Sequence, residues 1–218
     1  VAVMPGWQRS RGACLEVYVA RQLKMLIIDE PTLEPWGVQP AEWSGQIIGL
    51  WGAATVGKDS IQKHLGIGRA AFADALKEDL APTFRQMGLD MANPDHKRTG
   101  RMLLVEYGRL GRAVDPDYWI KRLFLPPERV CITDVRYANE CRWIWSKGGI
   151  VFEITRPGVG PANSEEERSF AEIRQYAQDH GIDIPQVAND VEGHPEVAAI
   201  EVRQRAALHF GSGTPTCV

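Results

Sequence analysis

The sequence predicts an α/β fold. Short apolar runs at 46–51, 130–134 and 150–155 have the length of single buried strands, and a helical pattern of apolar residues follows each of them. A further short run at 184–190 precedes a last helix. The first run leads into a loop bounded by glycines and then into a helix start. Strands that alternate with helices in this way are typical of a layered α/β domain.

Composition limits the classes of protein that the chain can belong to. It has 218 residues, 44% of them hydrophobic, and a formal net charge of -3. This is enough for one globular domain and argues against a general nucleic-acid coat protein. No apolar run approaches a membrane span or resembles a signal peptide. We expect a cytoplasmic protein that binds neither a membrane nor a nucleic-acid polymer. The cysteines form no C-x-x-C pair and are expected to be free thiols: Cys14, Cys131, Cys141 and Cys217.

Three segments are expected along the chain. Residues 1–44 are rich in proline and weakly periodic, with a short helix or strand at 16–28. We interpret 1–44 as a partly disordered extension translated upstream of a start at Met25; a clasp or an oligomer contact is the alternative. Residues 45–210 form the folded domain, and 211–218 form a flexible tail.

The stretch 46–65 carries a phosphate-binding pattern, G-x-x-x-x-G-K, placed between a strand and a helix. Glycines let the backbone curl so that successive N–H groups point at phosphate oxygens. The following helix adds free N–H donors and the positive end of its dipole. Lys58 can reach the outer phosphates as a point charge. The expected loop residues are Gly52, Ala53, Ala54, Thr55, Val56 and Gly57.

One position departs from this pattern. Asp59 stands where Ser or Thr is expected, and Ser60 follows it. Ser60 could meet magnesium directly after a small register change, whereas Asp59 could do so through a water molecule. Both alternatives stay open.

The next segment, 70–86, is expected to be a strand at 70–73 and then a helix that Asp74 caps. Leu76, Leu80 and Phe84 recur at i, i+4 and i+8 and form one buried stripe. Asp74 as a cap and Lys77 as a solvated side chain are the simplest interpretations.

Residues 96–125 combine an apolar stripe with arginines on the opposite side. At about 100° per residue, the apolar side chains fall within roughly 60° of one another: Leu103, Tyr107, Leu110 and Val114. The arginines all carry planar forks suited to phosphate oxygens: Arg98, Arg101, Arg109 and Arg112. We expect at least one of them to bind an anion.

Two glycines and an aspartate set the expected boundaries of this region. Gly108 and Gly111 predict a break in the helix. Asp115 is expected to cap a new helix with Pro116 in its first turn. Trp119 on that helix either faces the core or lines a pocket for a nucleobase.

The run 130–134 ends in Asp134, which is typical of a strand whose terminal carboxylate holds magnesium or its water. A helix follows and stops at Gly148 and Gly149. The strand 150–155 delivers Arg156 to a turn. Residues 158–163 are a candidate lid. Ser164 and Glu167 are expected to form a capping box at the start of the next helix. The chain then has a short last strand, an exposed pair Asn189–Asp190, and a final helix that Pro195 opens.

Several of these motifs, in this order, resemble the phage-type deoxynucleoside monophosphate kinases, a P-loop kinase family. The resemblance covers 46–207 and rests on GLWGAATVGKDS, FADALKEDL, RMLLVEYGRLGR with DPDYWIKRL, ITDVRYANE, and a late ND. Two features depart from the family pattern. Ala162 and Asn163 stand where a histidine is expected before Ser164, and the loop has Ala53 and Ala54 where the family has glycine.

The resemblance implies a three-layer P-loop kinase fold, a parallel sheet flanked by helices. It also implies ATP and Mg²⁺ as cosubstrates and phosphoryl transfer to a deoxynucleoside monophosphate (dNMP), in the host cytoplasm if a phage encodes the chain. Lys58 and the loop would hold ATP, with Ser60 or Asp59 and Asp134 at the metal. Arg156 would act from the edge of the lid, and Asn189 and Asp190 would flank the adenine of ATP. The substrate side would comprise Asp74, Lys77, Arg101, Arg112, Trp119, Arg136, Asn139 and Glu140; Lys58, Arg112, Asp134 and Arg136 would be catalytic.

Two alternatives are kept. The first is another small P-loop kinase, such as a dephospho-CoA kinase or a phosphomevalonate-type kinase. The second is a non-catalytic nucleotide-binding module, which predicts nucleotide binding without turnover. A homodimer is possible in either case, with the surroundings of Trp143 and Trp145 as the place to look.

Overall fold

The structure is a computed structural model, which describes residues 2–3, 28–29, 46–90, 93–125, 129–190 and 194–211. The chain divides into two compact units, 1–44 and 45–218. In the first unit, β1 (Ala2–Val3) and β2 (Ile28–Asp29) pair in parallel. The element expected at 16–28 lies outside the described residues except for its last residue, and the tail does so from 212 onward.

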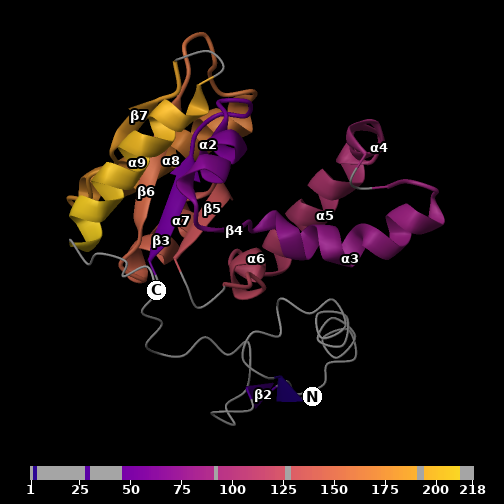
Figure 1. Cartoon of the computed structure of the whole chain (residues 1–218). Coiled ribbons are helices and arrows are strands. Elements are labelled where there is room, and N and C mark those ends of the chain that lie inside the picture. Colours follow the sequence, from indigo (N-terminus) through magenta and orange to yellow (C-terminus); the bar gives the residue numbers. More distant parts are fainter. Residues whose placement is uncertain are drawn as a thin grey trace. The chain divides into compact units, whose positions relative to one another are not determined.

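The second unit is built on a five-stranded, all-parallel sheet (Figure 1). From β3 the chain crosses to β4 and β5 on one side, and then to β6 and β7 on the other. The strand order therefore reverses at β3, and the carboxyl ends of strands at such a switch point form the usual binding crevice of open parallel sheets. In spatial order the strands are β4 (Gly68–Ala70), β5 (Val130–Val135), β3 (Ile47–Trp51), β6 (Ile150–Thr155) and β7 (Gln186–Ala188).

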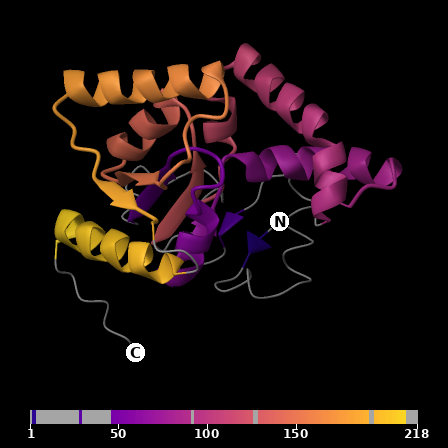
Figure 2. The same cartoon turned by 90° about the horizontal axis from the view of Figure 1, so that it is seen from above.

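Helices cover both faces of this sheet, which gives three layers (Figure 2). On one face α2 (Lys58–Leu65) packs against α9 (Pro195–Phe210). On the other face α7 (Ala138–Ser146) packs against α8 (Ser164–Asp179). Every residue of β3 is buried, as expected for a strand that is covered on both sides. The predicted α/β class, a parallel sheet flanked by helices, is confirmed.

An arm of helices leaves the sheet between β4 and β5 and extends to one side (Figure 1). The Asp79 carboxylate joins three of them, because it receives both terminal nitrogens of Arg122 at 2.6 Å and the hydroxyl of Tyr107 at 3.1 Å. The described helices of the arm are α3 (Ala73–Gln86), α4 (Pro94–Thr99), α5 (Arg101–Val114) and α6 (Tyr118–Lys121).

The prediction for α5 was wrong in two respects. Leu110 and Val114, expected in the core, are 58% and 74% exposed, and the buried residues of α5 are Gly108 and Gly111. The glycines do not break the helix. A Cβ on Gly111 would lie 2.8 Å from the ring of Trp119, so this face is glycine because the indole packs directly on the helix backbone. Arg98 lies on α4 and is not part of the same helical stripe.

Several predicted boundaries move by a few residues. The strand expected at 70–73 ends at Ala70, because the chain turns into α3 from Ala71 onward. Asp74 lies inside the first turn of α3 and does not cap it. Asp115 ends α5; its carboxylate accepts from the backbone N–H of Asp117, and α6 begins only after that turn. Asn163, one residue before the predicted cap, accepts from the N–H of Glu166 at the start of α8.

Other predicted boundaries are confirmed. The stripe of Leu76, Leu80 and Phe84 is buried in α3. Pro195 is the first residue of α9, as predicted. Helix α2 ends at Leu65, and Gly66 after it has a left-handed conformation.

Candidate functional site

The loop between β3 and α2 has the curled backbone that the glycine pattern predicts. Three of its residues have positive φ: Gly52 at 139°, Thr55 at 69° and Gly57 at 95°. Gly52 is also held close to the neighbouring strand, since a Cβ there would lie 2.2 Å from the carbonyl oxygen of Ile154. A larger residue at position 52 would therefore push the loop away from β6.

Helix α2 begins at the end of this loop and has no side-chain cap. Gly57 is the N-cap residue, and the first helical hydrogen bond runs from the N–H of Ile61 to the carbonyl of Gly57. The preceding N–H groups of the first turn have no intrahelical acceptor. They lie at the positive end of the helix dipole, which favours an anion. Asp59 and Ser60 occupy this turn and are exposed.

Lys58, the first residue of α2, lies back across the loop. Its ammonium donates to the carbonyl oxygens of Gly52 at 2.5 Å and Ala53 at 2.8 Å. Burial, followed by the positive charge of Arg136, lowers the pKa of Lys58 to about 8. Three carboxylates act in the opposite direction: Glu166, Asp59 and Asp134.

Two cations therefore lie near each other at the carboxyl edge of the sheet. Arg136 follows β5 directly and is exposed. Within the described ranges, neither Lys58 nor Arg136 belongs to an ion pair with a carboxylate. Neighbouring like charges without a bound counter-charge favour a multiply charged anionic ligand.

Asp134 is half-buried and directed at the start of α3. One carboxylate oxygen accepts from the N–H of Phe72 and the other from the N–H of Ala73, both at 2.9 Å. Burial raises the pKa of Asp134. This carboxylate holds the first turn of the arm against β5, a role that the sequence did not indicate. Among the described residues, no group of three or more His, Cys, Asp or Glu is arranged to hold a metal ion.

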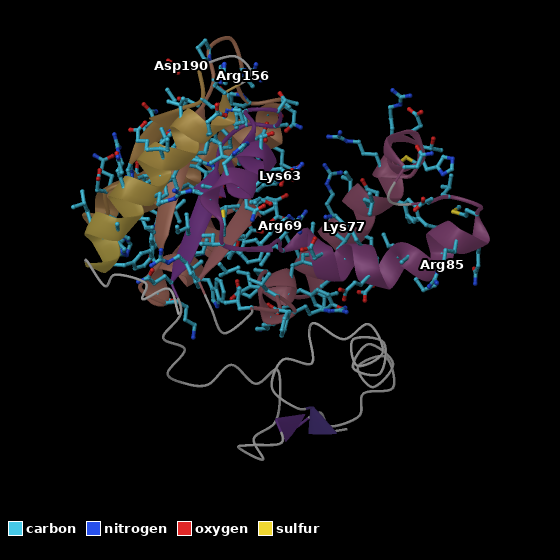
Figure 3. The ribbon with its side chains drawn as sticks, viewed as in Figure 1. Lys63, Arg69, Lys77, Arg85, Arg156 and Asp190 are labelled. Atoms are coloured by element: carbon cyan, nitrogen blue, oxygen red, sulfur yellow. The ribbon has the colours of Figure 1, made fainter. Side chains whose placement is uncertain are left out.

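Asp74 and Lys77 lie together with an arginine that the sequence analysis missed. The Asp74 carboxylate pairs with Arg69 at 2.9 Å and with Lys77 at 3.1 Å. Figure 3 shows Arg69 and Lys77 where β4 passes into α3, whereas Arg85 lies at the far end of that helix. Arg69 lies on β4, whereas the strand was expected to begin at residue 70. The sequence therefore provided no reason to place Arg69 beside Asp74.

Arg112 reaches the site from the C-terminal turn of α5. Its guanidinium lies over the ring of Tyr137, 4.4 Å from the centroid. The Tyr137 hydroxyl donates to Glu165 at 3.3 Å, and Glu165 also pairs with Arg109 at 2.7 Å. The arm and the start of α8 are thus linked. Arg101, at the other end of α5, is exposed and lies roughly 16 Å from Arg112 along the helix axis.

The side chains of three residues that were expected to contact the substrate form hydrogen bonds within the protein. Trp119 is 4% exposed and its indole N–H donates to the carbonyl of Gly108, which fits the core alternative. The Asn139 amide donates to the Pro116 carbonyl at 2.8 Å and to Asp117 at 3.0 Å. Glu140 is 6% exposed and accepts from backbone N–H groups. These positions do not present Trp119 or Glu140 to a ligand.

The ends of β6 and β7 bring the remaining predicted residues to the same edge. The N–H of Asn189 donates to the carbonyl of Thr155, and Figure 3 shows Arg156 and Asp190 at one end of the domain. Asn189 was predicted to be exposed but is half-buried, because its side-chain amide donates a hydrogen bond to the backbone carbonyl of Val56 in the loop. The expected lid at 158–163 starts with a bridge between Arg156 and Val159.

No family model matches the sequence. The chain is similar to a protein of Ictalurid herpesvirus 1 (strain Auburn) described as uncharacterized protein ORF76, with 33% identity over 96 residues. The match covers 40% of this chain and 40% of the viral protein, and the description of the viral protein states no activity.

In the described part of the chain, no helix is long and apolar enough for a membrane crossing.

Proposed function

We propose that this protein is a deoxynucleoside monophosphate kinase that transfers the γ-phosphoryl group of ATP to the 5′-phosphate of a dNMP. The observation that carries the proposal is the pair Lys58 and Arg136. Both cations lie beside the uncapped start of α2, without an ion-pair partner in the described residues. Such a group of donors suits a polyphosphate. The choice of a dNMP as acceptor rests on the ordered motifs of the sequence.

The proposed chemistry relies on positioning and on neutralisation of charge. An acceptor that is already a phosphate needs little general-base help, which agrees with a site that contains arginines and a lysine. Lys58 would exchange its two loop carbonyls for phosphate oxygens. Arg136, and Arg112 from the arm, would bind the transferred group and the acceptor phosphate.

The residues present fit a magnesium ion that is held mainly by the phosphates. Asp59 and Ser60 are exposed in the first turn of α2, whereas both oxygens of Asp134 already accept backbone N–H groups. Asp59 or Ser60 would therefore be the protein ligand, and Asp134 would act at longer range. The bound ion would neutralise charge on the phosphates.

The test is ADP formation from ATP and magnesium with each dNMP added singly, with dephospho-CoA, and without acceptor. We expect turnover that depends on at least one dNMP and that Lys58→Ala abolishes. Lys63→Ala is the matched control, because Lys63 lies exposed on the same helix and should retain activity. Turnover with dephospho-CoA alone would identify another small kinase. Saturable ATP binding without turnover would identify a nucleotide-binding module.

A further inference from the structure

Glu140 is a buried acid that the proposed chemistry does not use. It lies in the first turn of α7 and is 6% exposed. One of its oxygens, Oε2, accepts from the N–H of Arg136 at 2.7 Å and from the N–H of Tyr137 at 3.0 Å. Both donors belong to the two-residue link between β5 and α7. Hydrogen bonds from two successive N–H groups to one oxygen fix the backbone of this link.

The backbone of Arg136 is held from its other side as well. Its carbonyl accepts a short hydrogen bond from the hydroxyl of Ser169, a buried residue of α8. Glu140 thus holds the N–H of Arg136 while Ser169 holds its carbonyl, and the guanidinium stays exposed. Because both the N–H and the carbonyl of Arg136 are held, the position of its Cα is fixed. This position limits the region that the exposed guanidinium can reach.

Tyr137, the second residue of the link, connects Glu140 to another arginine. The Arg112 guanidinium lies 4.4 Å from the centre of the Tyr137 ring, and the Tyr137 hydroxyl donates to Glu165. A shift of the link would therefore move the surface on which Arg112 rests. The buried Glu140 side chain therefore influences the positions of two arginines from different elements, Arg136 and Arg112.

We propose that Glu140 is a positioning residue for the anion site: it touches no ligand, but it sets Arg136 directly and Arg112 through Tyr137. This inference rests on the proposed function in one respect, the use of these arginines for phosphate. A residue that merely starts α7 would affect folding and leave phosphate affinity unchanged. The two roles therefore make different predictions for binding.

The experiment measures the affinity of the full chain for inorganic tripolyphosphate by calorimetry, with thermal unfolding recorded in parallel. Glu140→Ala should weaken binding by about tenfold. Glu140→Gln keeps an oxygen acceptor for both N–H groups and should stay within about threefold of the wild type. Ser146→Ala, an exposed position at the end of the same helix, is the control and should not change binding.

A double-variant cycle with Arg136→Ala decides between the two roles. If Glu140 acts through Arg136, the two losses should be clearly less than additive, and the double variant should bind only slightly more weakly than Arg136→Ala, by the part that acts through Arg112. Additive losses, or normal affinity in Glu140→Ala, would overturn the inference. Should Glu140→Ala fail to fold, Glu140→Asp serves instead, since it keeps the carboxyl group but shortens the reach by one methylene group and should also weaken binding.

The same measurements separate this inference from the proposed function. A wild-type protein that binds no tripolyphosphate would overturn both. Tripolyphosphate binding that depends on Arg136 and Glu140, without turnover of any dNMP, would support the positioning role and remove the kinase proposal.

Discussion

The side-chain amide of Asn189 donates a hydrogen bond to the backbone carbonyl of Val56, with 2.7 Å between nitrogen and oxygen. This bond joins the end of β7 to the loop before α2, across 133 positions of sequence. The neighbouring Gly57 makes the approach possible, because a Cβ there would lie 2.3 Å from the Asn189 amide nitrogen. The sequence resemblance places Asn189 beside adenine, whereas the structure gives its side chain a contact with the loop.

The first prediction concerns Gly57→Ala. The residue has φ +95° and its new methyl group would displace Asn189. We expect a loss of more than about tenfold in affinity for ATP and for tripolyphosphate, because a left-handed alanine costs roughly 1–2 kcal/mol and the clash adds to it. Gly66→Ala is the control: φ is +70° at the other end of α2, with nothing within 4 Å of the added Cβ. Equal losses of affinity in the two variants would mean that contact with Asn189 is unimportant.

The second prediction separates the two roles of Asn189. If its side chain braces the loop, Asn189→Ala should weaken ATP and tripolyphosphate alike, by roughly fivefold for the loss of one hydrogen bond of about 1 kcal/mol. If it contacts adenine, only ATP binding should weaken. Titration of both ligands into the variant measures this directly. Gln186→Ala, at an exposed position of the same strand, controls for a general effect on β7.

The strands and the loop could be predicted because their signals are local. The run 47–51 is apolar throughout and becomes the central strand, buried on both faces. Gly52 and Gly57 occur where the backbone has positive φ, so a glycine pattern predicts the loop conformation. The start of α9 at Pro195 is likewise encoded by one residue. Such features need no knowledge of the rest of the fold.

The features that the sequence did not reveal depend on how separate elements pack together. The buried side of α5 consists of glycines, and glycine gives no signal in a pattern of apolar side chains. Only the ring of Trp119 packed against Gly111 explains it. Asp134 was expected at a metal, but its oxygens accept the N–H groups of Phe72 and Ala73, more than 60 residues away. The metal role of Asp134 remains a prediction that binding experiments must test.

The third prediction tests the glycine face of α5. In Gly111→Ala the new Cβ meets the rigid ring of Trp119 at 2.8 Å, so the free energy of unfolding should fall by roughly 1–3 kcal/mol. In Gly108→Ala the nearest atom is the flexible end of Leu76, at 3.1 Å. There the gain in helix propensity, about 1 kcal/mol, should make the change neutral or stabilising. Urea unfolding of both variants provides the comparison; a stabilised Gly111→Ala would contradict the close packing.

The fourth prediction follows from Lys58, whose pKa burial and Arg136 lower to about 8. Above pH ~8 the free protein holds Lys58 largely neutral. A bound polyphosphate places negative charge beside the amine and raises its pKa, so binding should take up protons, up to about one per site. The affinity should therefore fall as the pH rises through this range. Calorimetry in two buffers of different protonation enthalpy measures the uptake. Lys58→Ala should show none at this position; unchanged uptake in that variant would assign the proton to another group.

The last prediction uses the buried acid behind Arg136. Burial, and after it the charge of Asp134, raises the pKa of Glu140 to about 8, against 4.5 for an ordinary glutamate. Between these two values the folded protein binds more protons at this position than the unfolded chain does. The stabilisation is therefore complete below pH ~4.5 and is lost as the pH rises to about 8.

Glu140→Gln removes this titration while keeping an oxygen acceptor for the N–H groups of Arg136 and Tyr137. We expect the melting temperature of the wild type to fall relative to this variant between pH ~5 and pH ~8.5, and the difference to level off above. Parallel melting curves across this range would show that Glu140 is ionised throughout, and that the link between β5 and α7 is held by a permanent negative charge.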